Sequence, residues 1–157
     1  MMKAAAQLAA SLLTLAVAAF GQPARHQGHA AIVNSASTNS NAFRIVVEPS
    51  GRTQSTVAHR GREGQTSESR AATVGAIPGA LAERLYSDLE AAWPLSSLPP
   101  QHCLKSASFG TRLTIEFDGQ MTPDLSCGRI TDPKVRALAQ DAREIVAASG
   151  VKRNRVE

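Results

Sequence analysis

The sequence predicts an α+β domain in which a small antiparallel sheet of two hairpins packs against two helices in the order ββ-α-ββ-α. Three observations support this expectation. Residues 113–117 alternate between apolar and polar side chains and run into an Asp-Gly pair, which is the pattern of a hairpin. Residues 77–93 and 132–150 repeat apolar side chains at helical spacing. The two cysteines, Cys103 and Cys127, bracket the hairpin.

The first hairpin is expected near the start of the domain. Residues 43–48, Phe-Arg-Ile-Val-Val-Glu, are a β-branched run with apolar side chains at alternate positions. Pro-Ser-Gly-Arg at 49–52 has turn chemistry, and residues 54–59 are expected to return as a second strand. Residues 60–73 are rich in Gly, Ser and mixed charges. They are predicted to be a mobile loop inside a single domain that spans 43–150.

Both helices carry recognisable start and stop residues. The first has Pro78 in its opening turn, repeats Leu, Leu, Leu and Trp every four residues, and stops at Pro94. The second starts with Asp132 as a cap, followed by proline at the first helical position, and ends at Gly150. The apolar stripe of each helix is expected to pack on the sheet.

Composition and charge bound the possible functions. The chain has 157 residues, which suits one domain with tails, and 43% of them are hydrophobic, which suffices for a core. The net charge of +4 is spread along the chain without a dense basic block, and residues 151–157 form only a short basic tail. No nucleic-acid partner is therefore expected. An anionic surface remains an alternative partner that this charge supports weakly.

Residues 1–21 have the organisation of a secretory signal peptide. A lysine precedes an uncharged, mainly apolar run, and Ala19 and Gly21 place small residues where a signal peptidase needs them. An earlier cut or an uncleaved anchor are alternatives, although the run is short for a membrane span. The mature protein is expected to be secreted or periplasmic, with no stable transmembrane anchor. The Ala-, Ser- and Asn-rich residues 22–42 are expected to form a flexible linker.

Export changes the interpretation of the cysteines. In an oxidising compartment an even cysteine count favours a disulfide, so Cys103 and Cys127 are predicted to be bonded. Closing a loop of this size stabilises a domain by about 3 kcal/mol. The sequence has no Cys-x-x-Cys motif, and His102 is beside a cysteine without further ligands at metal spacing. Neither a metal site nor a redox site is therefore predicted.

The cysteine-bounded stretch resembles a known sequence pattern. Cys-x-Lys-Ser-x-Ser-Phe-Gly-Thr at 103–111 and Thr-Pro-Asp-Leu-Ser-Cys at 122–127 resemble an uncharacterised family of small exported bacterial proteins. The resemblance covers about 25 residues. It implies a disulfide-stapled domain of the cell envelope, and it implies no activity, cofactor or catalytic residue.

The sequence contains no recognisable reaction centre. No serine lies in a Gly-x-Ser-x-Gly turn, and no His-Glu-x-x-His motif occurs. No catalytic residue and no cofactor are therefore predicted, and a small secreted hydrolase is kept as an alternative. Its nucleophile, base and acid would come from Ser108 or Ser126, His59 or His102, and Asp118 or Asp124.

The favoured function is a non-catalytic binding or interaction module of the cell envelope, with an envelope or extracellular protein or an anionic surface as its partner. The outward side of the cysteine-bounded stretch is the part that structural roles leave open to a partner. The predicted partner-facing residues are Lys105, Arg112, Thr114, Glu116 and Asp124. A further alternative is an inhibitor that presents the disulfide-framed 118–126 loop to a secreted hydrolase.

Overall fold

The computed structural model describes residues 28–60, 66–69, 72–106, 108 and 110–151. Its strands are β1 Ala30–Asn34, β2 Ala42–Val47, β3 Arg52–Arg60, β4 Thr66–Ser69, β5 Thr73–Ala76, β6 Leu113–Phe117 and β7 Gln120–Met121. Its helices are α1 Gly79–Ala92, the short 3-10 helix η1 Leu95–Ser97, and α2 Pro133–Ala148. The predicted signal peptide lies outside the described residues.

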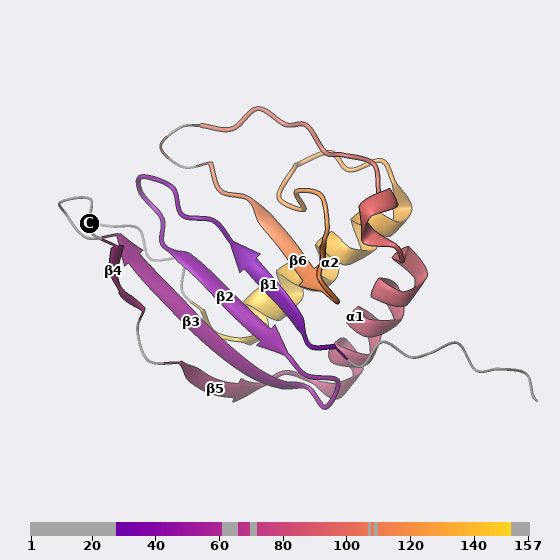
Figure 1. Ribbon diagram of the computed structural model, residues 1–157, viewed down its shortest axis with the longest axis horizontal. Helices are drawn as coiled ribbons and strands as arrows, with labels where there is room; N and C mark the ends of the chain where they lie inside the picture. The colour runs from indigo at the N-terminus through magenta and orange to yellow at the C-terminus, as the bar shows by residue number, and fades with distance from the viewer. Residues whose placement is uncertain (1–27, 61–65, 70–71, 107, 109, 152–157) are drawn as a thin grey trace, which may run out of the picture.

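The strands form one antiparallel sheet in the order β4-β3-β2-β1-β6-β7, and β5 pairs with β3 beside this path (Figure 1). The predicted α+β class with two helices and one disulfide is confirmed. The predicted order ββ-α-ββ-α with two hairpins is wrong. Among the described residues, five strands precede α1 and seven strands make up the sheet.

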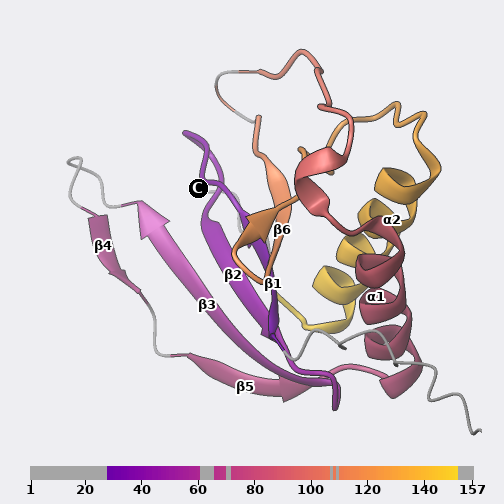
Figure 2. The same cartoon turned by 45° about the vertical axis from the view of Figure 1, so that its right-hand side comes forward.

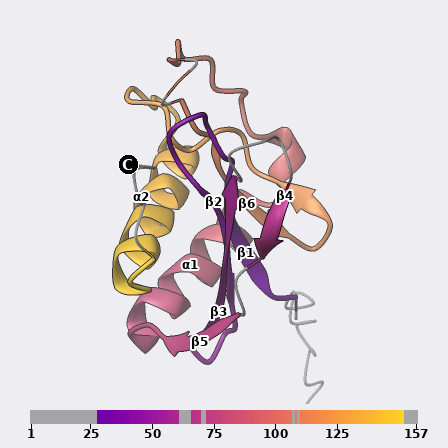
Figure 3. The same cartoon turned by 90° about the vertical axis from the view of Figure 1, so that its left-hand side faces the viewer.

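Both helices lie on the same side of the sheet, as the edge-on view in Figure 3 shows. The core fills the space between the helices and this face. Alternate side chains of β1, β2 and β6 point into it and meet the apolar stripes of α1 and α2. The buried core includes Ile32, Ile45, Val47, Leu113, Ile115, Phe117, Leu85, Leu89, Leu125, Leu138 and Ile145.

The predicted linker contains the central strand of the sheet. β1 lies within residues 22–42 and pairs with β2 on one side and β6 on the other. The prediction of a flexible linker is therefore wrong for β1. Its Ala-Ala-Ile-Val-Asn sequence shows no alternation because even Ala31, on the face away from the helices, is only 3% exposed.

The predicted mobile loop at 60–73 is also partly strand. β4 lies within it, β5 begins at its last residue, and both pair with β3. The side chains of β5 are exposed, so this edge strand has no buried face to give it a sequence pattern. Residues 61–65 and 70–71 lie outside the described residues.

The predicted helices are confirmed. In α2, the Asp132 side chain accepts a hydrogen bond from the Val135 N–H at 2.9 Å, which is the capping role expected of it. Gly150 follows the helix with a φ of 67°, a left-handed conformation that glycine adopts without strain. In α1, the Tyr86 hydroxyl accepts from Ala30 N at 3.1 Å and donates to Val47 O at 2.7 Å, which joins the helix to the sheet.

The second hairpin has the predicted tight turn. Asp118 and Gly119 both have positive φ, 44° and 73°, and connect β6 directly to β7.

The predicted disulfide is confirmed: Cys103 and Cys127 are bonded, with their Cα atoms 5.7 Å apart. The bond ties the long segment between η1 and β6 to the chain that leads into α2. The described residues of this segment, 98–106, 108 and 110–112, are called the arching segment below. Figure 2 shows this segment arching above the end of the sheet. Within the part of the chain that the structure describes, no helix has the length and apolar character needed to cross a membrane.

Candidate binding site on the open face of the sheet

The face of the sheet away from the helices, the open face, carries an ion pair. Arg44 on β2 and Glu116 on β6 form an ion pair across β1, with Nη1 and Oε2 2.6 Å apart. Both side chains are more than 40% exposed. Glu116, one of the predicted partner-facing residues, is therefore already paired within the chain.

A hollow of about 790 Å³ lies between this open face and the arching segment. It is lined by residues from β1, β6, the arching segment and the chain after β7. Four of the five predicted partner-facing residues line it: Lys105, Arg112, Thr114 and Asp124. The fifth, Glu116, lines a smaller neighbouring hollow of about 370 Å³. The structure thus brings these predicted residues to one region of the surface.

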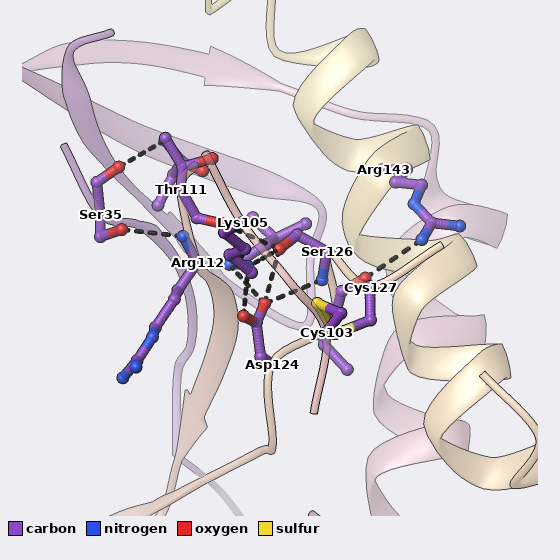
Figure 4. Close-up of polar contacts among 12 residues, drawn as sticks. Ser35, Cys103, Lys105, Thr111, Arg112, Asp124, Ser126, Cys127 and Arg143 are labelled. Carbon is purple, nitrogen blue, oxygen red and sulfur yellow. Dashed lines mark hydrogen bonds and ion pairs between the residues drawn. A yellow bond between two sulfur atoms is a disulfide. The ribbon is translucent and has the colours of Figure 1, made fainter. Parts of the chain in front are cut away.

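Lys105 and Asp124 form an ion pair that neutralises both charges (Figure 4). The Lys105 ammonium forms an ion pair with Asp124 and donates to Thr111 O and to Ser126 Oγ, each at 2.5 Å. The Lys105 and Asp124 side chains are 22% and 12% exposed. This pair therefore stabilises the arching segment, and its opposite charges largely cancel.

Asp124 is also an acceptor for backbone groups. Its Oδ1 accepts from Leu113 N at 3.2 Å, from Ser126 N at 3.0 Å and from Ser126 Oγ at 2.6 Å. Burial acts to raise the pKa of Asp124, but the hydrogen bonds from Lys105, Ser126 and Leu113 outweigh it and hold the pKa below its usual value.

The chain after β7 covers the outer edge of β6. Thr122 N donates to Ile115 O at 3.0 Å, and Thr122 Oγ1 accepts from Ile115 N at 2.9 Å. Asp124 Oδ1 then accepts from Leu113 N, so side-chain oxygens replace the carbonyls of a partner strand. Thr122 is only 3% exposed. An inhibitor would present the side chains of the 118–126 loop to its target. At Thr122 and Asp124, these side chains instead bond to the backbone of β6.

The disulfide and Asp124 lie close together. The ligand-type atoms of Cys103, Cys127 and Asp124 all fall within 4.8 Å of one another. In the observed disulfide, the two sulfurs are bonded to each other and offer no thiolate to a metal ion. The Asp124 carboxylate is committed to Lys105 and to backbone donors. This cluster is therefore explained by structural bonding.

Arg112 is the cation that remains uncompensated in the hollow. Its backbone is held by Ser35, since Arg112 N donates to Ser35 Oγ at 2.8 Å and Ser35 N donates to Arg112 O at 2.9 Å. Its guanidinium extends away from the Lys105–Asp124 pair in Figure 4 and has no hydrogen bond or ion pair with any described residue. His102, which is exposed, lines the same hollow.

Two large apolar side chains border the hollow and are exposed. Leu104 is fully exposed at 106%, and Met121 is 57% exposed. Val33 on β1 contributes a third apolar surface. These residues were not predicted as site residues, because a single leucine in a loop or a methionine after a turn has no periodic pattern. The useful sign in the sequence was that Leu104 belongs to no strand or helix stripe.

The hydrolase candidates whose side chains the structure describes do not form a Ser-His-Asp set. Over the described residues, no hydrogen bond joins a serine hydroxyl to an imidazole. The Ser126 hydroxyl instead contacts Asp124, Thr111 O and Lys105, and Lys105 is itself ion-paired with Asp124. The side chain of His59 lies outside the described residues.

Comparison with protein-family models, with curated proteins and with solved structures finds no match to this chain.

Proposed function

We propose that this protein is an exported, non-catalytic binding module of the cell envelope, and that the hollow on the open face of its sheet is the binding site. The observation that carries the proposal is the combination found there. Exposed Leu104 and Met121 line the same hollow as Arg112, whose guanidinium has no hydrogen bond or ion pair with any described residue. Large exposed apolar side chains next to a few polar groups are typical of interaction sites.

The segment that forms one wall of the hollow is held in place. The disulfide anchors it at Cys103, and the Lys105–Asp124 pair anchors it two residues later. Further along, Ser108 O accepts hydrogen bonds from Asn39 N and Ser37 Oγ, each at 3.1 Å. A site that is ordered before binding loses less conformational entropy when a ligand arrives. This order supports a recognition role.

Export is supported by the organisation of residues 1–21 and by the disulfide, since disulfides persist in oxidising compartments. The mass of the protein recovered from the envelope or the medium tests this part. A mature chain that starts near Gln22 is expected. A full-length chain in the cytoplasm would contradict export.

The binding role is tested by site-specific photo-crosslinking in cells that export the protein with its own leader. A photoreactive residue replaces Leu104 or Met121 in two variants, and Val74 in a matched control. Val74 is 66% exposed but lies on β5, outside the residues that line the hollow. Crosslinks from positions 104 and 121, with none from 74, are expected. Equal crosslinking from all three positions, or none, would refute the proposal.

A further inference from the structure

We propose that the hollow binds the free carboxyl-terminal end of a peptide whose last residue is aliphatic, with the terminal carboxylate on Arg112. This inference rests on the proposed binding role of the hollow and names its ligand class. Three properties of the site support it: its net charge, its apolar walls and its unused hydrogen-bonding groups.

The charge of the hollow selects an anion. Lys105 and Asp124 neutralise each other, so the guanidinium of Arg112 is left as the uncompensated charge. A guanidinium is planar and binds a carboxylate through two parallel hydrogen bonds. His102 lines the same hollow, and its imidazole ring offers an N–H donor. A ligand with a free carboxylate therefore fits better than a neutral or cationic one.

The apolar walls select an aliphatic neighbour for that carboxylate. Leu104 and Met121 are exposed in the free protein and line the same hollow as Arg112. An aliphatic side chain that covers them removes apolar surface from water, which is the main favourable term in most binding. Methionine is flexible and adapts to different aliphatic shapes. The walls thus suit a terminal residue such as leucine, isoleucine or valine.

The remaining polar groups favour a peptide over a plain aliphatic acid. The Thr114 hydroxyl has no hydrogen-bond partner among the residues that the structure describes, and Gln101 uses its amide nitrogen but not its oxygen. Peptide N–H and C=O groups can pair with both, whereas a hydrocarbon chain would bury them unsatisfied. The hollow of about 790 Å³ also has room for several residues.

The test compares two forms of one probe, acetyl-Gly-Ala-Ala-Leu, as the free acid and as the carboxamide. Calorimetric titration of the oxidised mature protein is expected to show the acid binding about tenfold more tightly, because only the acid forms the charged pair with Arg112. Arg112→Gln is expected to bring the acid to the affinity of the amide. Arg52→Gln is the matched control: Arg52 is also exposed but lies on β3, away from the hollow.

Each result decides the proposal. Equal affinity of acid and amide, or an acid preference that survives Arg112→Gln, would overturn it. Octanoate serves as a third probe, and tighter binding of octanoate than of the peptide acid would assign the hollow to aliphatic acids instead. If neither peptide form binds at about 1 mM, an affinity weaker than most specific interactions, the ligand class is wrong. Crosslinking from position 104 would then still support the binding role.

Discussion

The two faces of the sheet are built differently from the same strands. On the face toward the helices, Ile32, Ile45 and Ile115 are fully buried. On the open face, their neighbours Val33, Arg44 and Thr114 are exposed or half-buried, and Val33 and Thr114 line the hollow. Successive side chains of a strand point to opposite faces, so one residue contributes to stability and the next can contact a partner. Core packing and exposure to solvent are therefore separated by single positions along these strands.

The largest expected effect tests this separation at adjacent residues. Ile115→Ala removes a fully buried side chain and leaves a cavity, so a loss of about 2–5 kcal/mol in the free energy of unfolding is expected. Thr114→Ala, on the open face, is expected to change it by less than about 0.5 kcal/mol. Urea unfolding measures both. Similar losses for the two variants would show that the open face is also part of the core.

The disulfide joins the arching segment to the chain that leads into α2. Replacing both Cys103 and Cys127 with alanine is expected to lower the free energy of unfolding by about 3 kcal/mol, because the unfolded chain gains the freedom of an open loop. The loss is measured by the same urea titration. Mass spectrometry of the exported wild-type protein provides the control, since two free thiols there would contradict the bond itself.

Asp124 is expected to have the next largest effect. Asp124→Ala leaves the N–H groups of Leu113 and Ser126 without an acceptor and removes the partner of Lys105, at a cost of about 2 kcal/mol. Asp124→Asn keeps an acceptor oxygen and is expected to lose less. Because the folded pKa of Asp124 is lowered, its contribution is present above the unfolded pKa and is lost as the pH falls through the folded pKa. An Asp124→Ala loss that does not shrink in acid would contradict this assignment.

The elements that sequence predicted well are those with one buried face. α1, α2 and β6 each repeat apolar side chains with the period of their structure, and the turn after β6 has residues that tolerate positive φ. β2 and β3 were expected in about the right places for the same reason. Local chemistry is enough where one side of an element faces water and the other faces the core.

β1 and β5 were missed for opposite reasons. β1 buries four of its five residues, including Ala31 on the open face, so its sequence is a short apolar run with no period, set among Ser and Asn residues that resemble a linker. β5 has four exposed side chains and depends on backbone pairing with β3. In both cases the strand forms because of the strands that pair with it, and these partners cannot be recognised from the local sequence pattern.

The residues predicted to face outward line the two hollows, but their pairings were not predicted. The polar side of the cysteine-bounded stretch was visible from alternation, and Arg112 and Thr114 line the hollow as that pattern suggested. Lys105 meets Asp124 only because the arching segment folds back beside the disulfide, and Arg44 meets Glu116 across β1. These contacts depend on tertiary structure. The sequence therefore overstated how many charges are available to a partner.

One acidic side chain is buried on the covered side, among the residues that the structure describes. Asp141 on α2 is 1% exposed, and its Oδ1 pairs with Arg84 Nε on α1 at 2.6 Å. Its Oδ2 has no donor among the described residues. Burial, followed by the neighbouring Asp88 carboxyl, raises the pKa of Asp141 to about 6, against the lowering effect of Arg84. A proton shared with Asp88 would supply the missing donor.

The smallest expected effect on the free energy of unfolding comes from the Asp141 and Asp88 carboxyl groups, and it depends on pH. Because the folded pKa of Asp141 is raised, its stabilising contribution is complete below the unfolded pKa and is lost as the pH rises through about 6. Asp88→Asn removes the repulsion and is expected to raise the free energy of unfolding at neutral pH by about 1 kcal/mol, with no gain in acid. Urea titrations across this range measure it, and Glu90→Gln, on the exposed side of α1, controls for the change in net charge. A gain that is equal at all pH values would place its origin outside the Asp141 carboxyl.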